Sequence, residues 1–430
     1  MRVLVIGATG LIGEALVGRL AKRGHDVVLG VRNIGAAKKR WPAAEFVHVD
    51  YAELAATGQS AVGLHGIDAV VNAVGIFREQ GSQTFDALHV KGPLALFEAA
   101  AQAGVRRIVQ ISALGAHPYT DTGYLASKGR ADAALCKSRV PHTIVQPSLV
   151  FAPQGRSTRW FALLAALPLT PLPGGGRQRI QPVHLDDLCE AIVRLLDMPD
   201  APLRLEAVGG EPVTLRGYLG YFKQALRLPG GFVSVPMAWV RMMSRLLAFM
   251  PGSLATPESL RMLEAGSIGQ CRAFATVLGR APTPLEGFIG EHERTSMRRR
   301  AQLDWLLPLL RYAMALMWVA TGLVSLFAFP VQSSLELLAR TGLHGALAMT
   351  VLQGAALLDI VLGAALFWRP LRRWAYRAQF ILIAFYTAVI TVFLPEYWRH
   401  PYGPVLKNLP LLAAIALLHE LDDDNGPADR

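Results

Sequence analysis

Short runs of apolar residues alternate with helix-compatible stretches over the first part of the chain. The runs are rich in β-branched residues, and each ends in, or is followed by, a polar residue or a glycine. Strands of this kind, separated by helices, are typical of a parallel sheet covered by helices. The sequence therefore predicts an α/β fold here, with strands in RVLVI (2–6), DVVLGVR (26–32), FVHVD (46–50), DAVVNAVG (68–75) and RRIVQIS (106–112).

The last third of the chain has a different pattern, in which apolar stretches are long enough to be membrane helices. A helix needs about 20 apolar residues to cross the hydrocarbon core of a bilayer. Hydrophobic residues make up 52% of the chain and the mean hydropathy is +0.32, both high for a wholly soluble protein. The sequence predicts an all-α four-helix transmembrane bundle, with spans at 312–332, 342–368, 378–395 and 402–418.

Asp359 is the only charged residue in the second predicted span. At 1.5 Å per residue it lies about 13 Å from Trp368, near the middle of the membrane. Because a carboxylate facing lipid costs roughly 2.5–3.5 kcal/mol, Asp359 is expected to face the bundle interior. Asn408 and Lys407 are its expected partners. Contact with a lipid-soluble ligand, a proton site and a packing role all stay open.

The formal charge of +11 admits nucleic acid or anionic lipid as a partner. No basic and aromatic module for nucleic acid is visible, so the charge is assigned to membrane lipids. Arginines cluster at 298–300 and 369–377, and the positive-inside rule places such segments in the cytoplasm. We expect a multi-pass protein of a bacterial-type inner (cytoplasmic) membrane, with its N-terminal domain and C-terminus in the cytoplasm.

A glycine-rich turn, GATGLIG (7–13), follows the first predicted strand. Gly7 permits a tight turn, Gly10 lets the backbone approach a pyrophosphate, and Gly13 lets the next helix pack on the strand. The N-terminus of that helix would face the phosphates. The strand–turn–helix context predicts a dinucleotide site that also includes Thr9, Leu11 and Ile12.

Arg32 ends the second predicted strand, where an NAD-binding protein places an acid for the ribose 2′-hydroxyl. A guanidinium suits a 2′-phosphate instead. NADP(H) is therefore the favoured cofactor. NAD(H) remains the alternative if Arg32 is only a solvated side chain.

Ser112, Tyr124 and Lys128 form the predicted catalytic group. Tyr124 and Lys128 are four residues apart in YLASK and would share one face of a helix. A lysine ammonium favours the phenolate, so the tyrosine could exchange protons nearer neutral pH. Ser112 could hydrogen-bond the same substrate oxygen. The three cysteines match no metal-ligand spacing, and no metal site is predicted.

These motifs resemble the short-chain dehydrogenase/reductase superfamily, in its extended or atypical branch. The resemblance covers about residues 1–290 and rests on GATGLIG, NAVG, ISALGA, YLASK, QPSLVFAP and PVHLDDL. Within the superfamily the chain is most similar to the group containing the nucleotide-binding accessory subunit of respiratory complex I, which binds NADPH in a structural role. The resemblance implies a Rossmann-type parallel sheet with a small substrate subdomain.

The resemblance also implies further cofactor contacts. Lys128 would contact the cofactor in addition to its catalytic role beside Tyr124. Asp50 would meet the adenine. The adenosine side would be lined by Asn72, Ala73 and Gly75, and the nicotinamide would be bordered by Pro147 and Ser148.

His89 departs from the pattern, because many relatives carry a proton-relaying asparagine at this position. A histidine can relay protons too. A relay role and a packed side chain both stay open.

The segment VPMAWVRMMSRLLAFMP (235–251) is amphipathic, with two arginines among large apolar residues. It could lie on the membrane surface, cap the substrate cleft or be an ordinary helix of the subdomain.

The membrane part is similar to the DoxX-like family over about residues 305–421, notably in GPVLKNLPLLAAI (403–415). Some members of that family are linked to redox and quinone chemistry. The chain is thus expected to divide into an NAD(P)-binding domain (1–165), a substrate subdomain with a membrane-approach segment (166–300), a transmembrane bundle (301–421) and a disordered acidic tail (422–430).

The leading hypothesis is a membrane-anchored, NADP(H)-dependent oxidoreductase acting on a carbonyl or alcohol of a lipidic or quinone-like substrate. One alternative is a non-catalytic NAD(P)H-binding assembly or sensor protein. Another is a small carrier gated by the nucleotide-binding domain. The sequence predicts no oligomeric state.

Overall fold

The computed structural model describes residues 1–57, 63–247 and 256–422. It forms two compact units, Met1–Arg298 and Arg299–Arg430. The boundary falls inside one long helix, α12 (Glu291–Leu323). Each unit has its own hydrophobic core and is described by itself below.

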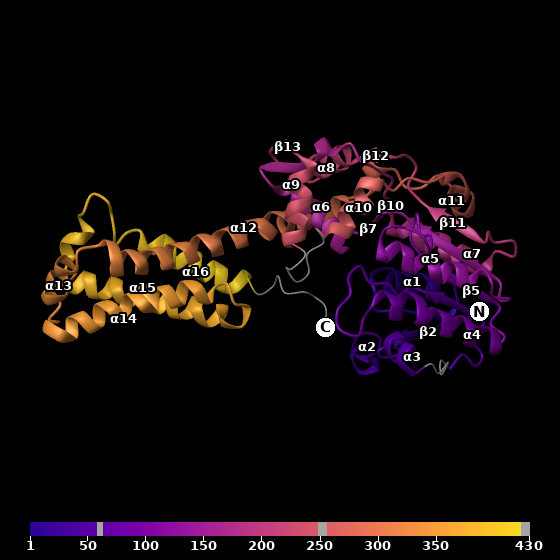
Figure 1. Ribbon diagram of the computed structural model, residues 1–430, viewed down its shortest axis with the longest axis horizontal. Coiled ribbons are helices and arrows are strands. Elements are labelled where there is room, and N and C mark those ends of the chain that lie inside the picture. Colours follow the sequence, from indigo (N-terminus) through magenta and orange to yellow (C-terminus); the bar gives the residue numbers. More distant parts are fainter. Residues whose placement is uncertain (58–62, 248–255, 423–430) are drawn as a thin grey trace. The chain divides into compact units, whose positions relative to one another are not determined.

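A seven-stranded parallel sheet is the centre of the first unit (Figure 1). Its strand order is β11-β6-β5-β4-β1-β2-β3, so the chain moves outward from β1 to β3 and then returns to the other side of β1 with β4. This is the doubly wound order, as predicted from the alternating pattern. The strands are β1 (Arg2–Ile6), β2 (Asp26–Val31), β3 (Glu45–His48), β4 (Ala69–Asn72), β5 (Arg107–Ile111), β6 (His142–Pro147) and β11 (Arg204–Ala207).

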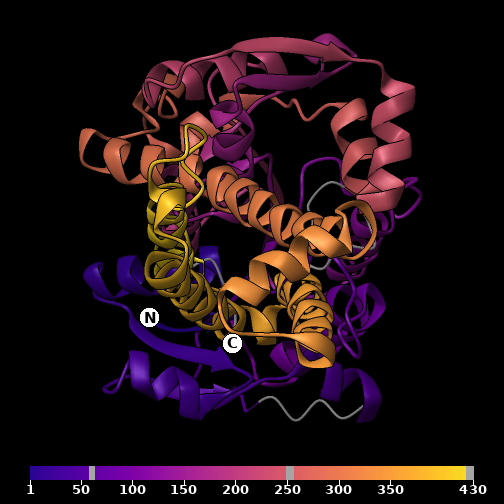
Figure 2. The same cartoon turned by 90° about the vertical axis from the view of Figure 1, so that its left-hand side faces the viewer.

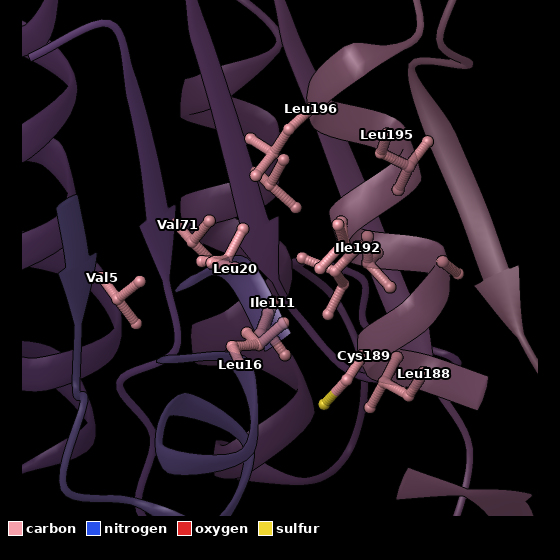
Figure 3. Close-up of a cluster of buried hydrophobic side chains, with 14 of the residues drawn as sticks. Val5, Leu16, Leu20, Val71, Ile111, Leu188, Cys189, Ile192, Leu195 and Leu196 are labelled. Atoms are coloured by element: carbon pink, nitrogen blue, oxygen red, sulfur yellow. The ribbon is translucent and has the colours of Figure 1, made fainter. Parts of the chain in front are cut away.

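Alternating side chains divide the core of this unit between the two faces of the sheet. Val3 and Val5 belong to one cluster of buried residues, and Leu4 and Ile6 belong to another. Figure 3 shows the first cluster, in which side chains of two helices meet Val5, Val71 and Ile111 of the strands. Helices α1 (Leu11–Lys22), α7 (Leu185–Asp197) and α11 (Cys271–Leu278) cover this face.

The opposite face of the sheet is covered by helices that lie between α1 and α7 in the chain. Leu96 and Phe97 pack there beside Leu135 and Tyr51. These side chains come from α3 (Tyr51–Thr57), α4 (Gly92–Gln102) and α5 (Gly123–Leu135). The last of these helices carries the predicted catalytic pair, so the packing of α5 on the sheet positions the site.

Part of the predicted substrate subdomain belongs to the sheet layer. β11 pairs with β6, and α7 and α11 pack on the sheet, although all three follow residue 165. The predicted division at residue 165 therefore does not separate two structural layers. The remaining helices of this unit include α6 (Arg156–Ala166), α8 (Leu215–Ala225), α9 (Met237–Leu247) and α10 (Pro257–Ala265). There are also three two-stranded sheets, which are β7 (Val150–Phe151) with β10 (Val183–His184), β8 (Leu169–Pro173) with β13 (Gly231–Val235), and β9 (Arg179–Ile180) with β12 (Val213–Thr214).

The second unit is helical, as predicted. Side chains from four of its helices share one hydrophobic cluster, which includes Met314, Leu362, Ile383 and Ile415. Figure 1 shows these helices side by side, and Figure 2 shows them from the end. They are α12, α14 (Gly345–Ala365), α15 (Arg372–Phe393) and α16 (Asn408–Leu421), and a shorter helix, α13 (Val331–Arg340), lies between the first two in the chain.

Three helices among the described residues are long and apolar enough to cross a membrane. They are the helical stretches Glu291–Ala328, Gly345–Ala365 and Arg369–Phe393. The fourth predicted span, 402–418, is helical only from Asn408 onward, and α16 has 14 residues. At 1.5 Å per residue this helix is about 21 Å long, shorter than the roughly 30 Å hydrocarbon core.

Asp422, expected at the start of a disordered tail, is instead buried at the end of α16. Its side chain is 3% exposed, and one carboxylate oxygen accepts a hydrogen bond from Arg311 Nη1 at 2.7 Å. The other oxygen accepts one from the Tyr376 hydroxyl at 2.7 Å. Asp422 thus ties α16 to α12 and α15. The remainder of the predicted tail, 423–430, lies outside the described residues.

This ion pair gives a test of the bundle. We expect Asp422→Ala to destabilise the second unit by roughly 3–5 kcal/mol, because the Arg311 charge stays buried without its partner. Tyr376→Phe, which removes one hydrogen bond to the same carboxylate, should cost only about 1 kcal/mol. Thermal unfolding of the purified protein in detergent measures both. A melting temperature for Asp422→Ala equal to that of the wild type would contradict the assigned role.

Candidate functional site

The glycine turn lies at the carboxyl end of β1, where the strand order reverses. Gly7 has a φ of +80°, a conformation that side chains other than glycine rarely adopt. A Cβ at Gly13 would lie 2.2 Å from the Gly7 carbonyl oxygen, so only glycine lets α1 approach the strand so closely. No side chain caps the first turn of α1, which begins after Gly10. Its backbone N–H groups therefore suit a pyrophosphate.

The residues expected around the adenosine lie at the ends of β2 and β3. Arg32 directly follows β2, is exposed, and makes none of the ion pairs found in the described part of the chain. Asp50 is half-buried and accepts a hydrogen bond from the Ala52 N–H at 2.8 Å. One carboxylate oxygen of Asp50 thus supports the start of α3. Arg32 is available to an anionic ligand.

Asn72 has a different place from the one expected. Its side chain is fully buried at the end of β4, where Oδ1 accepts from the Tyr51 hydroxyl at 2.9 Å and Nδ2 donates to Gln110 at 2.8 Å. The amide therefore joins strands and helix inside the domain and does not face an adenosine. The neighbours Ala73, which is half-buried, and Gly75, which is exposed, remain available to line the site.

Lys128 is buried beneath the site on α5. Its ammonium donates to the carbonyl oxygens of Val74 at 2.9 Å and Ile111 at 3.1 Å. Burial lowers the pKa of Lys128 to about 8, and Asp132 opposes this shift. The lysine therefore holds the loop after β4 and the end of β5 against α5.

Tyr124, one turn before Lys128, lies in an aromatic environment. Its ring stacks on Phe77 with centroids 4.7 Å apart and meets His89 edge-on at 5.6 Å. Burial raises the pKa of Tyr124 well above its ordinary value, and the nearby Asp132 and Glu258 charges add to the effect. The hydrogen bonds of Tyr124 to described residues are made by its backbone N–H and carbonyl oxygen.

Ser112 is buried and is turned toward a residue that the sequence did not single out. Its hydroxyl donates to Asp132 Oδ2 at 2.6 Å. With its proton used in this way, Ser112 can accept a hydrogen bond from an alcohol but cannot at the same time donate to a carbonyl oxygen. Burial raises the pKa of Asp132, and the Ser112 hydrogen bond opposes that shift.

Pro147 and Ser148, expected beside the nicotinamide, lie at the end of β6. Pro147 is buried and completes the strand. The Ser148 hydroxyl donates to the Gln181 carbonyl oxygen.

The carboxyl edge of the sheet brings the predicted site residues to one side of the domain. They are the glycine turn, Arg32, Ser112, Tyr124 and Lys128.

Two stretches of the chain match known protein families. Residues 7–165 match a family described as NAD(P)H-binding, and residues 315–416 match the DoxX-like family. The first stretch contains the glycine turn, Tyr124 and Lys128, and the second contains α14 and α15.

The chain joins an NAD(P)H-binding Rossmann-like domain to a DoxX-like domain.

Curated relatives share the NAD(P)H-binding domain. The 40 kDa subunit of mitochondrial NADH–ubiquinone oxidoreductase from Neurospora crassa is 27% identical over 195 residues, which are 45% of this chain and 51% of that protein. A photosystem II assembly factor from Guillardia theta is 30% identical over 204 residues, 46% of this chain and 61% of the relative. The chain spans about half the length of the first relative. The NAD(P)H-binding domain is homologous to complex I subunits of this type.

Solved structures resemble the same region. A nucleoside-diphosphate-sugar epimerase from Staphylococcus aureus superposes with a TM-score of 0.54 at 18% identity, covering 67% of this chain and 99% of that one. An NADPH-dependent quinone oxidoreductase from Escherichia coli, complexed with NADPH, gives a TM-score of 0.54 at 18% identity, with 66% and 97% covered. At this identity the likeness establishes the fold, which is that of oxidoreductases and epimerases.

His89 of the NAD(P)H-binding domain has both ring nitrogens occupied. Nε2 accepts from the Ile76 N–H at 3.0 Å, so Nδ1 carries the proton and donates to Ser127 Oγ at 2.9 Å. Burial, and then Lys128, lower the pKa of His89 to about 2. A neutral, fully bonded ring favours the packed histidine over the proton relay.

Three residues of the site were missed from the sequence. Asp132 lies four residues after Lys128, on the same helical face, and that spacing could have pointed to it. Phe77 and Glu258 gave no such signal. The Glu258 carboxylate comes from α10 and accepts from the Tyr124 N–H at 2.8 Å, a contact that only the fold creates.

Asp359 faces the interior of the DoxX-like domain, as expected. It is 8% exposed, and Oδ1 has no hydrogen-bond partner among the described residues. Its expected partner Asn408 donates instead to Thr387 at 2.8 Å. The acid thus sits among buried side chains without the partner expected for it.

The Ser112–Asp132 hydrogen bond leads to a stability test. We expect Ser112→Ala to destabilise the NAD(P)H-binding domain by about 1–3 kcal/mol, because the buried Asp132 carboxyl loses its short hydrogen bond. Gln146, at 3.4 Å from the same oxygen, is its other donor. The exposed Thr276→Ala should change stability by less than about 0.5 kcal/mol. Chemical denaturation of both variants checks this, and equal midpoints would contradict it.

Proposed function

We propose that the protein is a membrane-tethered oxidoreductase that uses NADP(H) on a carbonyl or alcohol of a lipidic or quinone-like substrate. One observation carries the proposal. Tyr124 and Lys128 lie on one buried face of α5, at the same edge of the sheet as the uncapped helix that follows Gly7. A proton donor beside a nicotinamide site is the arrangement that carbonyl reduction requires.

The bound cofactor would supply a hydride to the carbonyl carbon and so be oxidised as the carbonyl is reduced. The residues of this chain do the rest. Tyr124 gives its hydroxyl proton to the carbonyl oxygen and recovers a proton from solvent. Lys128 carries its positive charge beside the site and stabilises the tyrosinate formed. Ser112, held by Asp132, accepts a hydrogen bond from the product alcohol and orients it.

Arg32 is the basis for proposing NADP(H) over NAD(H). It is exposed at the carboxyl end of β2, next to where the ribose of a bound dinucleotide lies in this fold. A guanidinium there can pair with the 2′-phosphate in a bidentate manner.

The membrane domain supports the choice of substrate class. The DoxX-like domain and its three apolar helices associate the protein with a membrane. The arginines at 298–300 and 369–377 favour a cytoplasmic NAD(P)H-binding domain and C-terminus. A cytoplasmic reductase kept at the bilayer is best suited to a substrate dissolved in it, and the membrane lipids are then its surroundings.

A non-catalytic NAD(P)H-binding assembly or sensor protein is the second candidate. Phe77 covers Tyr124, and the Ser112 hydroxyl donates its hydrogen bond to Asp132, so carbonyl reduction at this group requires a rearrangement. The relatives named above include a complex I subunit and an assembly factor, which is consistent with a binding role.

Tyr124→Phe separates the two candidates. If Tyr124 transfers the proton, we expect turnover to fall by about 100- to 10,000-fold while NADPH binding is retained. NADPH oxidation by the full-length protein in vesicles would be followed with membrane lipid extracts and with short-chain quinones and aldehydes. Equal turnover in the variant would remove Tyr124 from the mechanism. A wild type that binds NADPH but oxidises it with none of these would support the binding role.

Arg32→Ala tests the cofactor. We expect wild-type protein to bind NADPH more tightly than NADH, and the substitution to weaken NADPH by about tenfold, or roughly 1.4 kcal/mol, with NADH little changed. Arg272→Ala, which removes an exposed arginine of α11, is the matched control. Fluorescence titration of the three proteins with NADPH and with NADH gives the six affinities. Equal affinities of the wild type for both dinucleotides would rule out the assignment.

A further inference from the structure

Helix α9 of the first unit has its apolar side turned outward. Trp239, Met242, Met243 and Leu246 are 60%, 44%, 44% and 58% exposed. Their spacing is i, i+3, i+4 and i+7, which places them on one face of a helix. These large side chains therefore form a continuous exposed stripe, referred to below as the α9 stripe.

The opposite side of α9 is the one that packs on the protein. Among the residues of α9 whose burial is described, 237–246, Ser244 is the buried one, at 4% exposure. Its hydroxyl donates to the Arg241 carbonyl oxygen at 2.9 Å. Arg241 is held by Glu264 of α10 at 2.9 Å. A helix that belonged only to the subdomain would bury its large apolar side chains and expose its serine. The arrangement in α9 is the reverse.

The charge of α9 indicates what covers the stripe. The helix, MAWVRMMSRLL, contains no acid. Of its two arginines, Arg245 lies next to the stripe, and Arg241 lies on the side that packs on the protein. Arg245 makes none of the ion pairs found among the described residues, and Arg241 is paired. Apolar side chains with a tryptophan, bordered by Arg245, fit the boundary between acyl chains and anionic headgroups.

The chain itself brings such a surface within reach. Its DoxX-like domain contains three helices long enough to span a membrane, so every copy of α9 is tethered to a bilayer. A second copy of this chain is a poorer occupant. One face of an 11-residue helix is far smaller than the roughly 800 Å² per partner that a stable interface needs.

We propose that the α9 stripe inserts into the surface of the membrane that holds the DoxX-like domain, and so docks the NAD(P)H-binding unit on anionic lipid. Helix α10, which packs on α9, carries Glu258, and Glu258 binds the backbone of Tyr124. Docking of α9 thus connects the bilayer to the helix of the catalytic tyrosine through one intervening helix. The docking itself does not depend on whether the protein turns over a substrate.

Nitroxide accessibility on the full-length protein tests the docking. Met243→Cys and a control, Leu203→Cys, are each made with Cys136 and Cys271 changed to serine, while the buried Cys189 is kept. Leu203, 65% exposed, is a large apolar residue before β11 at the edge of the sheet. The labelled proteins are reconstituted in vesicles of phosphatidylethanolamine and phosphatidylglycerol, and collision rates with oxygen and with a water-soluble nickel chelate are measured.

We expect the ratio of oxygen to nickel collisions to be several-fold higher at position 243 than at position 203. Arg245→Glu should lower the ratio at position 243 in these vesicles and leave it unchanged in vesicles of phosphatidylcholine alone. Retained NADPH binding shows that each variant is folded, and Leu246→Cys replaces Met243→Cys if that variant is not. Equal ratios at both positions would overturn the proposal. So would shielding of position 243 from both reagents, which would mean a protein partner or a second copy.

Discussion

The site depends on the hydrogen bonds that the buried ammonium of Lys128 makes to the backbone. The ammonium donates to the carbonyl oxygens of Val74 and Ile111, and so joins the ends of two neighbouring strands to α5. A cation placed in the protein interior must have its donors satisfied, and these carbonyls supply the partners. The result is a fixed position for α5 on the sheet. Tyr124, one helical turn earlier, takes its place from that contact.

Buried polar networks beneath the site serve the same purpose. Asn72 links Tyr51 to Gln110, and Ser112 links the end of β5 to Asp132 on α5. Both networks occupy side chains that would otherwise be free to bind a ligand. The same contacts make the strand ends rigid around Tyr124, whose ring is stacked on Phe77.

The DoxX-like domain is held together differently, because apolar side chains gain little by leaving lipid for one another. Small residues let its helices come close. A Cβ at Gly322 would lie 2.5 Å from the Ala356 carbonyl oxygen, and one at Gly363 would lie 2.9 Å from that of Ala315. Polar contacts such as Arg311 with Asp422 then fix one end of the bundle. Asp359 stands out against this background as a buried acid with an unpartnered oxygen.

The sequence by itself determined the parts of this protein that depend on local patterns. The β-branched runs and the glycine turn predicted the sheet and the tight turn after β1. The spacing of Tyr124 and Lys128 predicted that both lie on one face of α5, and the apolar stretches predicted the helical second unit. Each is a property of neighbouring residues, where strand alternation, helical periodicity or hydrophobic length acts directly.

The tertiary structure alone decided how distant residues meet. Nothing local indicates that β11 joins the sheet, that Glu258 reaches the backbone of Tyr124, or that Phe77 covers its ring. Asp422 followed an apolar helix and preceded a polar tail, and its burial depends on Arg311, 111 residues earlier. Such contacts arise because packing brings together groups from separate segments, and a buried charge or hydroxyl must then find its partner there.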